Sequence, residues 1–206
     1  MKIEKIVTGI ISTNCYIVQN EETKEAVIID PANYPKKMRS YISEEGLDIK
    51  AILLTHGHFD HIMGIDALLE EFDVPVYVHE DERELICDAV LNESNVYTNG
   101  YTFTGADYIR DGQVLKFAGY EFKVIHTPGH TSGGVCYYVE SEQTLFSGDT
   151  LFYASVGRTD FPTSSMSALV RSIREKLLIL PDDTIVYPGH MGATSIANEK
   201  EKNPFI

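Results

Sequence analysis

The chain passes from a strand into a helix at residues 55–64, which read Thr-His-Gly-His-Phe-Asp-His-Ile-Met-Gly. The apolar residues 52–54 come directly before this segment and are typical of a buried strand. Apolar side chains then recur at helical spacing after it, which predicts a helix that begins near Asp60. The members of this apolar stripe are Ile62, Ile65, Leu68, Leu69 and Phe72.

Four potential metal ligands lie within six positions of this turn, namely His56, His58, Asp60 and His61. Imidazoles and carboxylates are ligands that divalent transition metals favour. His56 and His58 are two residues apart in extended chain, so their side chains can point the same way. Asp60 and His61 turn away with the first helical turn, which indicates two metals rather than one. A helix cap alone accounts for Asp60 but not for three histidines beside it.

The composition limits the class of protein. The chain has 206 residues, 43% of them hydrophobic, and we expect one domain over 1–206. The net charge of −14 repels phosphate backbones, so we expect no nucleic-acid partner. No apolar run approaches the length of a membrane span, and three cysteines without a CxxC pair favour a reducing, cytoplasmic setting. The oligomeric state is not predicted.

Periodicity predicts a mixture of strands and helices. Strands are expected at 3–7, 15–18, 26–29, 50–54, 76–78, 114–117, 120–125, 135–139, 144–146 and 184–187. Helices are expected at 34–45, from Asp60 to before Pro75, at 80–90, from a cap at 163–165 to about 178, and at 194–202. Residues 92–108 are expected to form a loop.

Three further ligand candidates follow predicted strands. Pro-Gly-His occurs at His130 and again at His190, and Gly148 precedes Asp149. Loops that a rigid sheet positions commonly carry binding residues. We therefore expect His130, Asp149 and His190 to join the first four ligands.

Four segments, taken in this order, resemble the metallo-β-lactamase superfamily. They are the His-Gly-His-Phe-Asp-His segment at 56–61, Pro-Gly-His-Thr at 128–131, Gly-Asp-Thr at 148–150 and Pro-Gly-His at 188–190. Two more, Thr-Asn-Cys-Tyr at 13–16 and Gly-Arg-Thr-Asp-Phe at 157–161, are similar to its glyoxalase II-like branch, the hydroxyacylglutathione hydrolases. The resemblance implies an α/β fold of the α+β type, a four-layer αββα sandwich with metals at one edge between the sheets. It is closest to the short, single-domain bacterial type, without the helical domain that contacts glutathione in longer enzymes.

The resemblance also implies roles for individual residues. His56, His58 and His130 hold one metal, Asp60, His61 and His190 hold the second, and Asp149 bridges them. His126 is not at a ligand position. The metals are expected to be two divalent ions, zinc first, with iron or manganese as alternatives.

Such a pair, about 3.5–4 Å apart, lowers the pKa of a shared water toward about 7. The hydroxide attacks the carbonyl of a small-molecule thioester such as an S-acylglutathione, and Asp60 orients it. Arg158 stands where longer enzymes have a basic substrate contact, so it is expected to bind a substrate carboxylate. An ion pair with Asp160 is the alternative role.

Three other functions remain open. Persulfide dioxygenases share the histidine loop and the Gly-Arg-Thr-Asp-Phe segment, and their single iron would take His58, His130 and Asp149. They tend to have alanine directly before the last histidine, where this chain has Gly189. A metal-stabilised binding module is disfavoured, because structural zinc sites are closed and usually rich in cysteine. A lactonase, or a β-lactam or phosphodiester hydrolase, would keep the fold and change the substrate.

Overall fold

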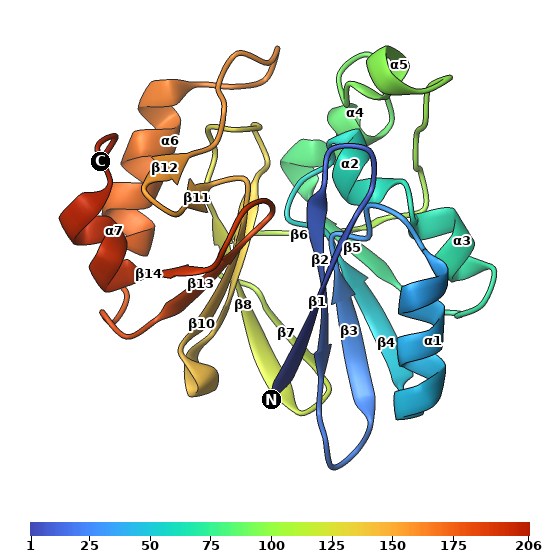
Figure 1. The fold of residues 1–206 in the computed structure, drawn as a ribbon. Helices are drawn as coiled ribbons and strands as arrows, with labels where there is room; N and C mark the ends of the chain where they lie inside the picture. The colour runs from blue at the N-terminus through green and yellow to red at the C-terminus, as the bar shows by residue number, and fades with distance from the viewer.

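Two six-stranded sheets lie face to face in the computed structural model, which describes residues 1–206 (Figure 1). The first sheet has the order β1-β2-β3-β4-β5-β6, and the second has the order β14-β13-β10-β9-β8-β7. The first sheet comprises β1 (Lys2–Thr8), β2 (Thr13–Gln19), β3 (Glu25–Ile29), β4 (Asp48–Leu53), β5 (Val76–His79) and β6 (Asp107–Ile109). The second comprises β7 (Val114–Phe117), β8 (Tyr120–His126), β9 (Val135–Val139), β10 (Thr144–Gly148), β13 (Ile185–Pro188) and β14 (Thr194–Ser195). A small hairpin, β11 (Leu151–Phe152) and β12 (Ser155–Val156), follows β10.

Helices cover the outer face of each sheet, with α1 and α3 beside the first and α6 and α7 beside the second (Figure 1). The helices are α1 (Lys36–Glu45), α2 (Phe59–Ile62), α3 (Ile65–Leu69), α4 (Arg83–Ile86), α5 (Ser94–Tyr97), α6 (Met166–Ser172) and α7 (Ile196–Lys202). Two short 3₁₀ helices are η1 (Glu80–Glu82) and η2 (Glu140–Glu142), and η3 (Ile173–Leu177) is a π-helix. The order helix, sheet, sheet, helix confirms the predicted αββα sandwich. None of the helices combines the length and the apolar character that a membrane crossing requires.

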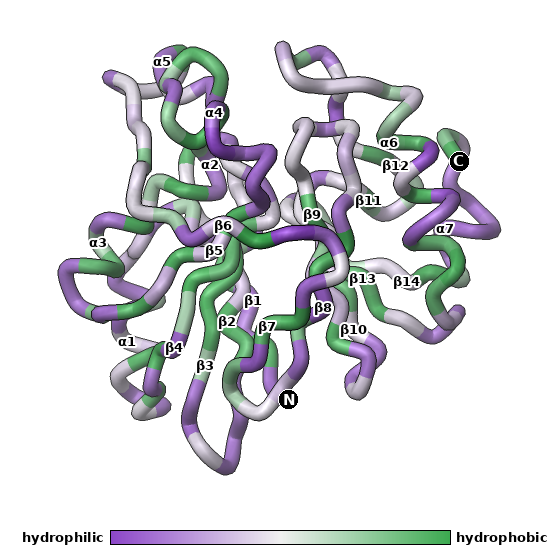
Figure 2. Tube along the Cα trace, turned by 180° about the vertical axis from the view of Figure 1, so that it is seen from behind, coloured by the Kyte–Doolittle hydropathy of each residue, from purple (hydrophilic) through white to green (hydrophobic).

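Alternating side chains along the strands build the layers. In β3, Ala26 and Ile28 pack with the helix residue Met38, whereas Val27 and Ile29 pack with Phe122 of the opposite sheet. Both faces of β3 are therefore buried, as in a strand enclosed between layers. Figure 2 shows the apolar segments gathered along the central strands and the hydrophilic ones along the outer loops.

Several predicted elements differ in the structure. The helix expected after Asp60 breaks at Gly64, because the Gly64 N–H donates to the Pro31 carbonyl at 2.7 Å instead of to the preceding helical turn. A Cβ on Gly64 would lie 2.6 Å from that oxygen, so this contact requires glycine. The helix expected at 80–90 is only η1 and α4, and the loop expected at 92–108 contains α5 and the start of β6. The helix expected at 194–202 begins as strand β14. These segments are too short for hydrophobic periodicity to distinguish a helix from a strand or a loop.

Candidate metal centre

The structure brings all seven predicted ligands together at one edge of the two sheets. His56 and His58 follow β4, and Asp60 and His61 lie in α2. His130, Asp149 and His190 follow β8, β10 and β13. They form three overlapping groups of possible metal ligands: His56 with His58 and His130, Asp60 with His61 and His190, and His56 with His61 and Asp149.

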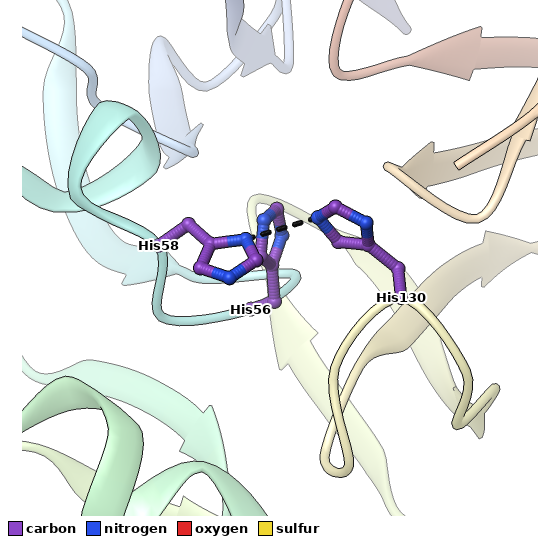
Figure 3. A group of neighbouring side chains, drawn as sticks. All are labelled: His56, His58 and His130. Carbon is purple, nitrogen blue, oxygen red and sulfur yellow. Dashed lines mark hydrogen bonds between the residues drawn. The ribbon is translucent and has the colours of Figure 1, made fainter. Parts of the chain in front are cut away.

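The three-histidine group joins the two sheets. His56 and His58 extend from the loop after β4, and His130 extends toward them from the loop after β8 (Figure 3). His58 Nδ1 lies 2.9 Å from His130 Nε2, and the His56 ring centroid is 4.8 Å from each of the other two. The ligand atoms of the three lie within 4.8 Å of one another, close enough to share one ion.

The second group lies beside the first, with Asp149 between them. Asp60 Oδ2 is 3.2 Å from His190 Nε2 and 3.3 Å from His61 Nε2. Asp149 Oδ2 is 3.6 Å from His130 Nε2 and 3.4 Å from His190 Nε2, and its Oδ1 is 3.5 Å from His61 Nε2. The Asp149 carboxylate therefore faces ligands of both groups, as a bridging position requires.

The protonation of these residues differs between the groups. Burial lowers the pKa of His58 to about 3 and holds that of His56 well below its usual value, so both present neutral lone pairs at pH 7. Burial also lowers the pKa of His190, but hydrogen bonds to Asp149 and Asp60 outweigh it and raise the pKa to about 9. In the metal-free chain, the proton on His190 supplies positive charge that a cation would otherwise supply.

Unpaired buried atoms show that the residues fit a metal. His56 Nε2, His61 Nε2 and Asp149 Oδ1 are buried and have no hydrogen-bond partner. Each such group costs about 1–3 kcal/mol when it is left unsatisfied. A bound cation removes that cost, and the nitrogen and carboxylate donor set suits a divalent metal.

Two residues that were not predicted as site residues, Asp30 and Thr13, hold the ligands in place. Asp30 accepts hydrogen bonds from the backbone and hydroxyl of Thr55 at 2.7 and 2.6 Å, and its Oδ2 lies 2.9 Å from His61 Nδ1. Thr13 Oγ1 donates to Asp60 Oδ2 at 2.7 Å. A carboxylate behind a ligating imidazole fixes the ring orientation and tautomer. The available signal for Asp30 was its place directly after an apolar strand.

The start of β2 fastens the loop that carries His190. Asn14 Nδ2 donates to the carbonyls of Pro188 and Met191 at 2.9 and 3.0 Å, and Tyr16 Oη donates to the Pro188 carbonyl at 2.6 Å. Asn14 and Tyr16 thus position the loop that carries His190, whereas Thr13 contacts the predicted ligand Asp60.

A cavity of about 390 Å³ opens over both groups, a size typical of sites for small ligands. Its polar floor includes His58, Asp60, His130, Asp149 and His190. Its apolar wall is formed by Ile11, Phe59, Tyr97, Phe152, Val156, Phe161 and Met191. Glu93 and Arg158 are the other charged residues that line it.

Arg158 forms the alternative ion pair with Asp160, and its contact with a substrate stays a prediction. It lines the cavity, and its Nε and Nη2 atoms also donate to Asp160 at 3.0 and 2.8 Å. Its backbone carbonyl lies 2.8 Å from His130 Nδ1 and orients that ring. The preceding Gly157 is required because a Cβ there would lie 1.8 Å from the Asp149 carbonyl oxygen.

His126 lies outside these groups. Its ring stacks on His79 with centroids 4.1 Å apart and an interplanar angle of 14°. Its Nε2 lies 2.9 Å from the Ser132 carbonyl oxygen, to which it donates. Asp81 completes a possible ligand group with the two rings, but parallel stacked rings do not aim their in-plane lone pairs at one point.

The metallo-β-lactamase superfamily model matches residues 8–190. A probable metallo-hydrolase, YqgX, of Bacillus subtilis is 38% identical over 100% of this chain and 98% of its own length. The hydroxyacylglutathione hydrolase GloC of Haemophilus influenzae is 34% identical over 100% of this chain and 98% of its own.

Solved structures show the same architecture. BLEG-1, a B3 metallo-β-lactamase, has a TM-score of 0.92 and 42% identity, and the match covers 99% of each chain. TTHA1623 in a di-iron-bound form has a TM-score of 0.87 and 36% identity, over 98% of this chain and 100% of that one. ETHE1 from Myxococcus xanthus has a TM-score of 0.82 and 31% identity, over 99% of this chain and 84% of that one.

Proposed function

The chain belongs to the metallo-β-lactamase superfamily, and from this premise we propose that it is a hydrolase with two divalent metal ions that cleaves a thioester such as an S-acylglutathione. The observation that supports two ions is the second ligand group, Asp60, His61 and His190, beside the three histidines. We propose zinc for both positions, with iron as the alternative that the di-iron form of TTHA1623 suggests.

Divalent ions bound here lower the pKa of a coordinated water and polarise a carbonyl oxygen. Among the residues of this chain, Asp60 is the one that orients that water. Burial raises the pKa of Asp60, but the charge of His61 and hydrogen bonds from His190 and Thr13 outweigh it, so the carboxylate stays ionised. The contacts with Thr13, His61 and His190 all use Oδ2. Oδ1 is therefore left to accept a hydrogen bond from the attacking water.

The leaving group and the walls of the cavity favour a thioester. A thiol has a pKa near 8.5, so a thiolate leaves without a general acid to protonate it. The apolar walls can hold an acyl group. We propose that Arg158 binds a substrate carboxylate, because its ion pair with Asp160 is exposed and solvent screening makes such pairs weak enough for a substrate to replace.

A persulfide dioxygenase is the second candidate, and the resemblance to ETHE1 favours it. In that function one iron would use His58, His130 and Asp149. The second ligand group favours the hydrolase, since a single iron leaves Asp60, His61 and His190 without a role. Glycine at position 189, in place of the alanine of the dioxygenases, favours it too. A lactonase shares the proposed metal chemistry and differs only in the ester that is cleaved.

One parallel experiment separates these functions. The protein is reconstituted with zinc or iron and assayed with S-lactoylglutathione, a small acyl thioester, a lactone and glutathione persulfide, with oxygen uptake followed for the last. The hydrolase predicts thioester cleavage and close to two metals per chain by elemental analysis. A single iron with oxygen consumption would establish the dioxygenase instead, and cleavage of the lactone alone would establish the lactonase.

We further propose a small-molecule substrate and a reducing compartment such as the cytoplasm. All three cysteines, Cys15, Cys87 and Cys136, are unpaired in the structure. The net charge of −14 supports the absence of a nucleic-acid partner.

A further inference from the structure

A buried carboxylate outside the ligand set connects the two loops that carry the three histidines. Glu82, the last residue of η1, has no solvent exposure. Its Oε2 accepts a hydrogen bond from the backbone N–H of Gly57 at 2.8 Å. Its Oε1 accepts one from the backbone N–H of Gly133 at 2.7 Å. Gly57 lies between His56 and His58, and Gly133 lies three residues after His130.

Both contacts depend on glycine. A Cβ on Gly57 would lie 2.9 Å from a Leu85 methyl carbon and 3.2 Å from Glu82 Oε2. A Cβ on Gly133 would lie 2.6 Å from the Glu82 backbone nitrogen. Neither glycine has a positive φ, so the need for glycine comes from close packing against the Glu82 segment rather than from backbone strain.

The two loops belong to different sheets. The loop with Gly57 follows β4 of the first sheet, and the loop with Gly133 joins β8 to β9 of the second. One carboxylate that accepts from both backbones therefore fixes the distance between the loops. Burying a carboxylate is costly unless hydrogen bonds satisfy it, and no lysine or arginine pairs with this one. That cost is consistent with a role beyond packing.

We propose that Glu82 is a positioning residue for the three-histidine metal site: it sets the separation of His56 and His58 from His130 and thereby raises the affinity of that site for a divalent cation. Partners behind metal ligands typically change metal affinity about 10–100-fold. The inference rests on the proposed metal site but not on the identity of the reaction.

The test measures metal affinity of the whole protein rather than activity. Glu82→Gln keeps the shape but offers one oxygen and one amide NH₂, so one of the two glycine N–H groups loses its acceptor. The variant is made in a His61→Ala background, which removes a ligand of the second group, so that Zn²⁺ competition against a chelator reports the three-histidine site. We expect affinity for Zn²⁺ to fall about 10–100-fold.

A matched control separates positioning from general destabilisation. Glu199 is also fully buried, and its Oε2 accepts from the Ala154 N–H at 2.9 Å and from Asn203 Nδ2 at 2.8 Å, outside the two loops that carry the three histidines. In the same background, Glu199→Gln should lower the melting temperature and leave Zn²⁺ affinity unchanged. If Glu82→Gln does not fold, Glu82→Asp replaces it, because a side chain shorter by one methylene cannot reach both N–H groups.

Two results would overturn the inference. One is Zn²⁺ affinity at the parent level in a folded Glu82 variant. The other is an equal loss of affinity in Glu199→Gln. Neither depends on whether the protein without these changes hydrolyses a thioester, and absence of that activity would overturn the proposed function alone.

Discussion

Replacing Gly189 by alanine tests the placement of Asp149, the carboxylate that we propose bridges the two metals. A Cβ at this position would lie 2.2 Å from Asp149 Oδ1 and 2.8 Å from His61 Cε1. Ordinary contact begins at 3.4 Å, so Asp149 or its neighbours must move by about 1.2 Å. A misplacement of about 1 Å in a catalytic centre can cost about 100-fold in rate, or about 2.7 kcal/mol. Gly189 has no positive φ, so backbone strain does not contribute.

The assay is kcat/KM for thioester hydrolysis by the zinc-loaded protein, together with metal content and melting temperature. We expect Gly189→Ala to lose about 100-fold in kcat/KM. The control is Gly192→Ala, because a Cβ there meets no atom within 4 Å and its φ is also not positive. A Gly189→Ala protein that keeps two metals and a rate within about threefold of the parent would show that the position of Asp149 does not govern the reaction.

Three further predictions concern the second ligand group, the cavity rim and pH. His61→Ala and His190→Ala should each lower the rate of thioester hydrolysis by more than about 100-fold and remove one metal per chain, as measured by elemental analysis. The loss of a metal ligand should have a larger effect than the loss of a residue that hydrogen-bonds to a ligand. The full rate in both variants would exclude the two-metal mechanism. Arg158→Ala should raise KM for an anionic thioester about tenfold with a smaller change in kcat, measured by steady-state kinetics, and an unchanged KM would leave only its ion pair with Asp160. The pKa of His190 is raised to about 9, so in the metal-free protein its proton stabilises the fold fully below about pH 6.5, and that stability is lost as the pH rises through 9. The melting temperature of the metal-free protein should therefore fall from pH 7 to 9, and a flat profile would contradict this assignment.

The ligands were predictable because each follows a strand with a clear pattern. The apolar residues before Thr55 and the glycines before Asp149 and His190 are local signals, and they place side chains at the ends of strands. The uninterrupted apolar run Ala26–Ile29 is likewise typical of a strand that is buried on both faces, as β3 is. The grouping of the ligands around metals came from the family resemblance, and their metal-binding roles stay predictions.

What the sequence did not reveal depends on distant contacts. The helix after Asp60 breaks at Gly64 because the backbone at Pro31 and Asn33 lies against it, and nothing near Gly64 in sequence indicates this. Glu82 lies in a charged run that reads as a solvated helix, yet its partners are 25 and 51 residues away. β6 has only three residues, too few to show alternation.

The bonds from Asn14 and Tyr16 to the Pro188 carbonyl link positions 174 and 172 residues apart. At synthesis rates of about 5–20 residues per second, Pro188 is synthesised on the order of 10–30 s after Asn14 and Tyr16. The loop that carries His190 can therefore take its place only after residue 188 has left the ribosome. Until then, Asn14 and Tyr16 lack the carbonyl acceptor that they have in the folded chain.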